Sequence, residues 1–258
     1  MEEHAETDPP ELDPATLLQV VEHRSFGVVY QPLVAVGSGE VHGFEALARF
    51  RSREGADLPP NGVFRALHDN PLLLLQVETA VKALQVAHAP PGAKLFVNLD
   101  PDALLAAGQP DASHPVLAQL VGRAGLVVEI IENAKLSDAR ASLAMAEILR
   151  THGAELALDD IGADHAMLAF PVLVGVDYLK LDRTWLRRRQ PEFDTLLRKL
   201  LEFARETGKR TVLEGVETVA DLERARHLGI DYAQGFLFRD RFREVVPHTG
   251  RRSARYAT

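Results

Sequence analysis

The chain has 258 residues, of which 46% are hydrophobic and 26% are charged, and its formal net charge at neutral pH is −8. This length allows a large domain with a full hydrophobic core, and the composition differs from that of disordered chains. The negative charge argues against polymeric nucleic acid as the main partner, because binding to a phosphate backbone depends on basic side chains. The absence of cysteine excludes disulfides, thiolate-bound zinc and a cysteine nucleophile, and we expect a cytoplasmic protein.

The two ends of the chain differ in composition from its middle. Residues 1–13 are acidic and contain proline, unlike a secretory or transit peptide. We expect a disordered acidic tail or linker over residues 1–19, one folded domain over residues 20–245, and a C-terminal tail over residues 246–258. The longest nearly apolar run, residues 166–176, contains proline and glycine and is too short to cross a bilayer, so we expect no membrane segment.

The folded domain begins with a predicted hairpin. Apolar runs at residues 26–36 and 41–50 are separated by Gly-Ser-Gly-Glu at residues 37–40, which is typical of two antiparallel strands joined by a turn. Leucine and valine then recur at three- and four-residue spacing over residues 63–68 and 72–86, which predicts helices.

Strand and helix patterns alternate through the rest of the domain. Short apolar segments lie at residues 95–97, 126–128, 156–158, 176–179, 211–213 and 230–233, and helix-compatible stretches include residues 138–151, 191–207 and 219–228. This alternation predicts an α/β fold of parallel strands covered by helices. If the parallel sheet closes into a barrel, the C-terminal ends of its strands meet at one mouth.

A polar side chain follows each of these six segments. In chain order these residues are Asn98, Glu129, Asp159 with Asp160, Lys180, Glu214 and Gln234. Polar residues also end strands at ordinary solvated surfaces, which is the alternative interpretation. Here, however, oxygen donors recur with a single lysine, and all-oxygen ligation favours Mg²⁺, Mn²⁺ or Ca²⁺ over zinc.

The adjacent pair Asp159 and Asp160 is the strongest local signal. Two neighbouring ionised carboxylates repel each other, so the pair requires a cation, a raised pKa or side chains that separate into water. A solvated Asp-Asp turn before Gly162 is the simpler hypothesis for an isolated pair. The polar residues at the other strand ends favour a shared cation site.

Motifs spread over about residues 20–243 resemble one known family. They are Tyr30-Gln31-Pro32, Gly43-Phe44-Glu45-Ala46-Leu47-Ala48-Arg49, Val128-Glu129-Ile130-Ile131-Glu132, Leu158-Asp159-Asp160-Ile161-Gly162, Tyr178-Leu179-Lys180-Leu181-Asp182, Glu214-Gly215-Val216-Glu217-Thr218 and Gln234-Gly235-Phe236. In this order and spacing they resemble the EAL domain, a bacterial family of cyclic-di-GMP phosphodiesterases. A single Glu-Ala-Leu tripeptide would not be specific enough to indicate this family.

The resemblance implies a fold and an activity. The expected fold is a modified (β/α)8 barrel of the TIM type, whose first strand runs antiparallel to the others. The expected reaction is hydrolysis of cyclic-di-GMP (3′,5′-cyclic diguanylate) to linear pGpG with one or two Mg²⁺ or Mn²⁺ ions. A homodimer is a further option that the resemblance leaves open.

Roles for individual residues follow from the resemblance by matching position. The implied metal ligands are Glu45, Asn98, Glu129, Asp159, Asp160 and Glu214, and the implied catalytic residues are Glu45, Asp160, Lys180 and Glu214. Lys180 would hold the attacking water or a phosphate oxygen, although neutralising Asp182 is an alternative role for it. The implied substrate-binding residues are Gln31, Leu47, Arg49, Asp182 and Gln234. Glu132 and Glu217 would anchor the loop after the aspartate pair, and we expect both to be buried hydrogen-bonding struts.

This chain departs from the family pattern in several places, among them the loop after the aspartate pair and the end of the domain. Active members usually continue the aspartate pair with Phe-Gly-Thr-Gly-Tyr-Ser-Ser, whereas this chain has Ile161-Gly162-Ala163-Asp164-His165-Ala166-Met167. Arg239 and Arg241 stand at the end of the domain that usually helps to hold guanine in the family. Neither departure removes an implied metal ligand.

Three hypotheses of different classes therefore compete. The first is an active cyclic-di-GMP phosphodiesterase. The second is a weak or inactive relative that serves as a cyclic-di-GMP receptor or a protein-interaction module, which the altered loop favours. The third is an unrelated metal-dependent lyase on a barrel, since fold alone does not fix chemistry, but it leaves the Glu-Ala-Leu and Glu-Gly-Val-Glu motifs unexplained.

Overall fold

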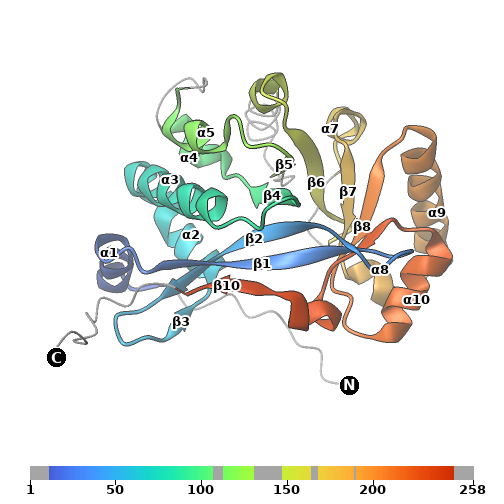
Figure 1. The fold of residues 1–258 in the computed structure, drawn as a ribbon, viewed down its shortest axis with the longest axis horizontal. Helices are drawn as coiled ribbons and strands as arrows, with labels where there is room; N and C mark the ends of the chain where they lie inside the picture. The colour runs from blue at the N-terminus through green and yellow to red at the C-terminus, as the bar shows by residue number, and fades with distance from the viewer. Residues whose placement is uncertain (1–11, 107–112, 131–146, 164–167, 189, 247–258) are drawn as a thin grey trace.

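The computed structural model describes residues 12–106, 113–130, 147–163, 168–188 and 190–246, and its strands belong to one sheet (Figure 1). The strands are β1 (Phe26–Ala35), β2 (Val41–Arg51), β3 (Asp57–Leu58), β4 (Lys94–Asn98), β5 (Leu126–Ile130), β6 (Glu155–Ile161), β7 (Tyr178–Leu181), β8 (Arg210–Leu213), β9 (Tyr232–Ala233) and β10 (Arg243–Val245). The helices are α1 (Pro14–Glu22), α2 (Pro60–His68), α3 (Pro71–Ala87), α4 (Pro101–Leu105), α5 (Pro115–Leu120), α7 (Phe170–Gly175), α8 (Thr184–Arg187), α9 (Pro191–Glu206) and α10 (Val219–Leu228), followed by the 3₁₀ helix η1 (Phe236–Arg241).

The sheet closes on itself as a barrel. Neighbouring strands follow the order β1, β2, β4, β5, β6, β7, β8, β9 and back to β1. From β2 through β9, each pair of neighbours in the barrel is parallel, whereas β1 is antiparallel to both β2 and β9. The predicted barrel with an antiparallel first strand is therefore confirmed. The short strands β3 and β10 extend β2 and β1 outside the closed ring.

The ends of the helices follow local sequence signals. The Asn70 side chain accepts a hydrogen bond from Leu73 N at the start of α3, and Thr218 forms a capping box with Asp221 at the start of α10. Gly229 ends α10 with φ of +72°, a conformation that glycine adopts without steric cost. These signals explain why the predicted helices at 72–86, 191–207 and 219–228 agree closely with the observed ones.

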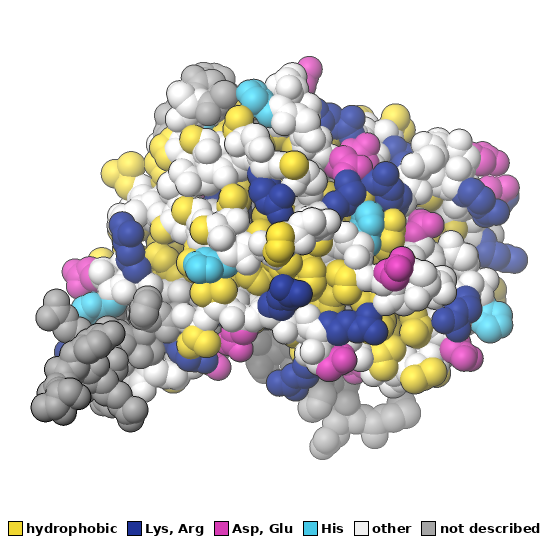
Figure 2. Space-filling model, in the orientation of Figure 1, with side chains coloured by type: hydrophobic (Ala, Val, Ile, Leu, Met, Phe, Trp, Pro, Cys, Tyr) yellow, Lys and Arg dark blue, Asp and Glu magenta, His cyan; other side chains and the backbone are white. Residues whose placement is uncertain are grey.

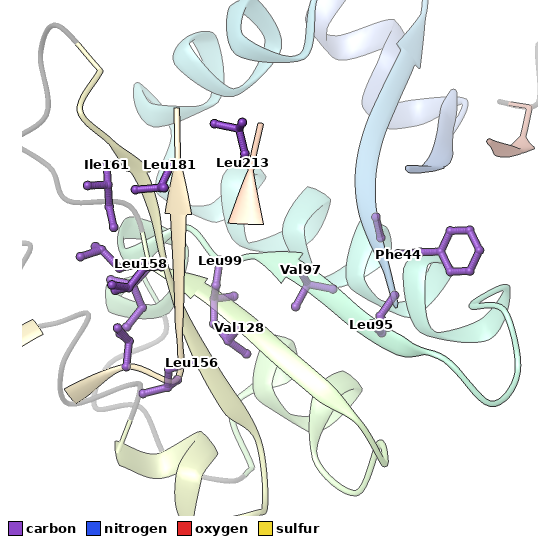
Figure 3. Close-up of a cluster of buried hydrophobic side chains, with 14 of the residues drawn as sticks. Phe44, Leu95, Val97, Leu99, Val128, Leu156, Leu158, Ile161, Leu181 and Leu213 are labelled. Carbon is purple, nitrogen blue, oxygen red and sulfur yellow. The ribbon is translucent and has the colours of Figure 1, made fainter. Parts of the chain in front are cut away.

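Alternation along the strands divides the core into two parts. Side chains that point out of the barrel pack against the helices and form the larger cluster, which includes Val97, Val128, Leu158 and Leu181 from four successive barrel strands (Figure 3). Side chains at the alternate positions point into the barrel and form a smaller cluster of Leu33, Phe96, Val127, Ala157, Tyr178 and Val212. Because side chains alternate between faces, the residue two positions beyond each of these inner residues also faces the barrel interior.

The N-terminal boundary differs from the expectation. Helix α1 includes residues 14–19, and Leu17, Val20 and Val21 are buried with Phe26 and Phe50 in a separate cluster. The expectation of a disordered tail up to residue 19 was therefore wrong for residues 14–19, because a capped helix with an apolar face covers this edge of the barrel. The expected helix at 138–151 is observed only over 147–151, and its remainder lies outside the described residues.

The outer surface carries both charge signs. On the face shown in Figure 2, basic and acidic side chains are interspersed around hydrophobic side chains over the middle of the molecule. Within the described ranges, there is no helix with both the length and the apolar character needed to span a bilayer.

Candidate active site

Polar side chains form a layer above the inner hydrophobic cluster, at the C-terminal mouth of the barrel. Several of them lie two positions after an inner hydrophobic residue: Asn98 follows Phe96, Glu129 follows Val127 and Lys180 follows Tyr178. The two-residue period of a strand therefore brings them together, although Asn98 and Lys180 are 82 positions apart in the chain. The predicted convergence of the strand ends is observed in the structure.

Lys180 lies at the centre of this layer and is fully buried. Its Nζ atom is 2.6 Å from Glu129 Oε1, 2.9 Å from Asp159 Oδ1, 2.9 Å from Glu214 Oε1 and 3.3 Å from Glu45 Oε2. Among the described residues it makes no recorded contact with Asp182, whose carboxylate accepts a hydrogen bond from Thr184 N. The alternative hypothesis that Lys180 neutralises Asp182 was therefore wrong.

Glu45 is held by amide side chains as well as by Lys180. Asn98 Nδ2 donates to Glu45 Oε1 at 2.9 Å, and Gln234 Nε2 donates to Glu45 Oε2 at 2.5 Å. Gln234 Nε2 also donates to Gln31 Oε1 at 3.1 Å, and Gln31 lies directly opposite Glu45 in the β1–β2 ladder. Residues from β1, β2 and β4 and from the end of β9 thus fix the orientation of the Glu45 carboxylate.

A bulge in β6 allows Asp159 and Asp160 to act together. The register between β6 and β7 shifts between Leu158 and Ile161, and Asp160 has φ of +56°. In a regular strand, adjacent side chains point to opposite faces, and a bulge with one left-handed residue removes this constraint. Carboxylate oxygens of both aspartates consequently lie within 4.8 Å of one another and of a Glu214 oxygen.

Gly162, which follows the bulge, allows the backbone to pack closely against Trp185. Its φ is +92°, and a Cβ atom at this position would lie 2.1 Å from Nε1 of the Trp185 indole. That indole donates a hydrogen bond of 2.6 Å to Ile161 O. The glycine that follows the aspartate pair is therefore required by both its backbone conformation and the buried tryptophan.

The carboxylates of the site outnumber its single cationic side chain, which changes their protonation. Burial, followed by repulsion from Glu45, raises the pKa of Glu129 well above its usual value, and burial with the charge of Asp159 does the same for Glu214. Loss of hydration and the neighbouring Asp159 raise the pKa of Asp160 to about 6. Burial alone would lower the pKa of Lys180, but the surrounding carboxylates raise it well above its usual value. The lysine thus stays charged, and protons compensate part of the carboxylate charge when no cation is bound.

Two groups of these acids are arranged as divalent cations require. The first consists of Glu45, Glu129 and Asp159, the second consists of Asp159, Asp160 and Glu214, and the ligand oxygens within each group lie within 4.8 Å of one another. Glu129 Oε2 is buried and accepts no hydrogen bond from the described residues, which leaves an oxygen available for a cation. The residues therefore fit one or two hard cations such as Mg²⁺ or Mn²⁺.

Arg49 lines two cavities, of which the first lies beside the carboxylates of the site. The first has a volume of about 630 Å³ and is lined by Leu47, Arg49, Asn98, Asp159 and Asp160 together with residues of α2 and α3. The second has a volume of about 700 Å³ and is lined by Arg49, Phe236, Arg239 and Phe242 among others. Arg241 instead donates to Gly39 O at 2.8 Å.

The two predicted loop anchors have different outcomes. Glu217 is exposed, so the expectation that it is a buried strut was wrong, because the chain turns outward there to begin α10. Its role as a loop anchor stays a prediction. Glu132 and the altered loop residues Asp164, His165, Ala166 and Met167 lie outside the described residues.

Sequence reasoning missed three polar residues on α3. Glu78, Lys82 and Gln85 are buried and line the first cavity. Their signal was present in the sequence, since they lie on the same helical face as the core residues Leu74, Val77 and Val81. Charged side chains on the apolar face of a helix are rare without a partner.

Together, the fold and the site define an α/β barrel with a cluster of carboxylates at its mouth. A family model described as the EAL domain matches residues 15–240. The chain therefore belongs to the EAL domain family, as the sequence motifs indicated.

Known relatives and solved structures agree with this assignment. "Probable cyclic di-GMP phosphodiesterase PdeB" of Escherichia coli (strain K12) is 26% identical over 228 residues, which cover 86% of this chain and 44% of PdeB. The solved structure "PaMucR Phosphodiesterase, c-di-GMP complex" has a TM-score of 0.72 at 26% identity and covers 86% of this chain and 94% of that one. The structure "Klebsiella pneumoniae BlrP1 pH 8.0 calcium/cy-diGMP complex" has a TM-score of 0.67 at 25% identity, and the match covers 83% of this chain and 55% of that one. This chain thus spans less than half the length of PdeB.

Proposed function

We propose that this chain hydrolyses cyclic-di-GMP to linear pGpG with Mg²⁺ or Mn²⁺ as cofactor. The observation that carries the proposal is the convergence of Glu45, Glu129, Asp159, Asp160 and Glu214 around Lys180, beside a cavity of about 630 Å³. The names of PdeB and of the PaMucR complex support the choice of substrate.

Each side chain of the cluster has a defined part in this reaction. Asp159 belongs to both acidic groups, so it would help to hold a cation with Glu45 and Glu129 and also a cation with Asp160 and Glu214. Asn98 donates to Glu45 through Nδ2 and keeps its amide oxygen as a further ligand. When bound, two divalent cations neutralise phosphoryl oxygens and lower the pKa of a water molecule, which supplies the nucleophile.

Lys180 changes its role when cations bind. In the absence of cations its ammonium group compensates the charge of four carboxylates. With bound cations compensating part of this charge, the ammonium group of Lys180 would be free to donate to the attacking water or to a phosphate oxygen, where negative charge develops. The buried position of Lys180 keeps this donor fixed relative to the ligands of both cations.

The two cavities give room for an extended dinucleotide. Arg49 lines both of them, so it would contact a substrate that puts one nucleoside in each cavity. Leu47 lines the first cavity beside the carboxylates, and Gln31 and Gln234 lie on the other side of Glu45. Asp182 completes the set of implied substrate contacts from the end of β7.

The test is chromatography of cyclic-di-GMP after incubation with the purified chain and Mn²⁺. We expect conversion to pGpG by the wild type and none by Asp159→Asn or Glu45→Gln, each with an unchanged circular dichroism spectrum. The exposed substitution Lys199→Met serves as the matched control and should retain activity. Binding of cyclic-di-GMP without product at any Mn²⁺ concentration would reject hydrolysis and support the receptor hypothesis.

Two further expectations belong to this proposal. The enzyme would act in the cytoplasm, and a homodimer is a possible form of it. Cell fractionation tests the first, and light scattering with parallel activity measurements at several protein concentrations tests the second.

A further inference from the structure

A polar floor lies beneath the first cavity, on the buried face of α3. Glu78, Lys82 and Gln85 follow one another at spacings of four and three residues, so they share one face of the helix. Their exposed fractions are 3%, 2% and 2%, and all of them line the cavity that also contains Asp159 and Asp160. This set of side chains plays no part in holding the cations.

The hydrogen-bonding capacity of this floor is only partly used within the protein. Lys82 Nζ lies 2.7 Å from Glu78 Oε2, and the ammonium group makes no other hydrogen bond or ion pair with the described residues. An ammonium group has three donors, so two of them remain available. Gln85 Nε2 donates to Ala46 O at 2.6 Å, but Gln85 Oε1 is buried without a hydrogen-bond partner.

Such an arrangement is costly unless a ligand completes it. Burying an ion pair removes both charges from water, and a buried carbonyl oxygen without a donor adds a further cost. Burial raises the pKa of Glu78, which the charge of Lys82 opposes. A ligand that supplies one acceptor to Lys82 and donors to Glu78 and Gln85 would offset these costs.

The Watson–Crick edge of guanine offers this combination of one acceptor and two donors. It presents the O6 acceptor beside the N1–H and N2–H₂ donors, whereas adenine presents one donor group, N6–H₂, beside the N1 acceptor. One donor residue and two acceptor residues therefore pair with three groups of guanine but with only two of adenine. An adenine in the same orientation would also direct its amino group towards the ammonium of Lys82.

We propose that Lys82 is a specificity-determining residue, which donates to O6 of a guanine in the first cavity while Glu78 and Gln85 accept from N1–H and N2–H₂. This inference rests on the proposed function, because it takes a cyclic dinucleotide as the substrate. It assigns to Lys82 the choice between guanine and adenine rather than any part in bond cleavage. The charge of Lys82 favours the ionised, acceptor form of the Glu78 carboxylate, against the opposite effect of burial.

The decisive experiment measures base preference by binding, independently of hydrolysis. Calorimetric titration of the chain with guanosine 5′-monophosphate and with adenosine 5′-monophosphate gives the preference of the wild type and of Lys82→Met. We expect the wild type to prefer the guanine nucleotide and Lys82→Met to lose at least about tenfold of that preference, as expected for one lost base contact. Lys199→Met, which removes an exposed ammonium, should keep the wild-type preference.

Kinetics provide a second measure of the same property. For cyclic-di-GMP against cyclic-di-AMP, Lys82→Met should reduce the ratio of kcat/KM mainly through KM, and Lys82→Arg should restore part of the ratio. If the wild type hydrolyses neither compound, the proposed function fails while the calorimetric preference still tests Lys82. If Lys82→Met does not fold, as judged by its circular dichroism spectrum, Glu78→Gln should show the loss of preference instead.

Three results would overturn the inference. The wild type could bind the two nucleotides equally, or Lys82→Met could keep the full preference for guanine. A loss of affinity that is equal for both nucleotides would place the ammonium at a phosphate rather than at the base.

Discussion

Replacing Lys180 by methionine separates the two roles assigned to this residue. Methionine has a similar volume but no charge, so Glu129, Asp159 and Glu214 lose the cation that lies 2.6 to 2.9 Å from each of them. Breaking a buried ion pair by removing one partner costs about 3–5 kcal/mol, because an uncompensated charge remains. We therefore expect metal-free Lys180→Met to lose about 3–5 kcal/mol of unfolding free energy at pH 8.

This loss should depend on both pH and cations. Protons can replace the missing positive charge, so the destabilisation should become smaller at pH 5. Mn²⁺ supplies positive charge at the same place, so it should recover part of the loss at pH 8 without restoring hydrolysis. In the matched variant Glu129→Gln the lysine keeps its other partners, and we expect metal-free stability near that of the wild type.

The assay uses the single tryptophan of the chain as its reporter. Trp185 is buried and donates to Ile161 O beside the aspartate pair, so its fluorescence follows unfolding close to the site. Urea unfolding in EDTA and in Mn²⁺, at pH 5 and pH 8, gives the free energies. Equal stability of Lys180→Met and wild type in EDTA at pH 8 would refute the idea that Lys180 compensates buried charge.

Three further predictions concern the same region. Gly162→Ala should lower the urea midpoint more than the matched control Gly153→Ala does. Both glycines have positive φ, but only a Cβ atom at position 162 would clash with the Trp185 indole. Equal effects of the two substitutions would contradict the role of that contact. The folded pKa values of Glu129 and Glu214 lie above the unfolded value, so the folded state binds more protons and metal-free stability should fall as pH rises from 5 to 8. The increase in melting temperature caused by Mn²⁺ should correspondingly grow with pH, and an increase that is constant over this range would contradict the charge excess. Asp160→Asn should keep the left-handed backbone, which asparagine tolerates, but should reduce the number of Mn²⁺ ions bound in equilibrium dialysis; unchanged binding would exclude Asp160 as a ligand.

Much of the barrel followed from the sequence because one-dimensional periodicity determines which side chains share a face. The polar residues Asn98, Glu129, Lys180 and Glu214 each follow an apolar segment, and parallel strands bring such positions to one mouth. The inner and outer core layers follow from the same two-residue period. For these elements, local pattern and global fold agree.

Other features depended on three-dimensional relations that no local pattern contains. The bulge at Asp160 arises where β6 and β7 change register, and neither strand shows this alone. Glu217 lies in a motif but turns outward, since its position depends on where α10 begins. The buried pair Glu78 and Lys82 interrupts the apolar face of α3, and its possible role is apparent only from the cavity that the two side chains line.

Anomalous diffraction at the manganese edge, from crystals grown with Mn²⁺, tests the central claim most directly. We expect manganese bound by Asp159, with Glu45 and Glu129 on one side and Asp160 and Glu214 on the other when two ions bind. Manganese elsewhere, or none among these carboxylates at saturating Mn²⁺, would contradict it.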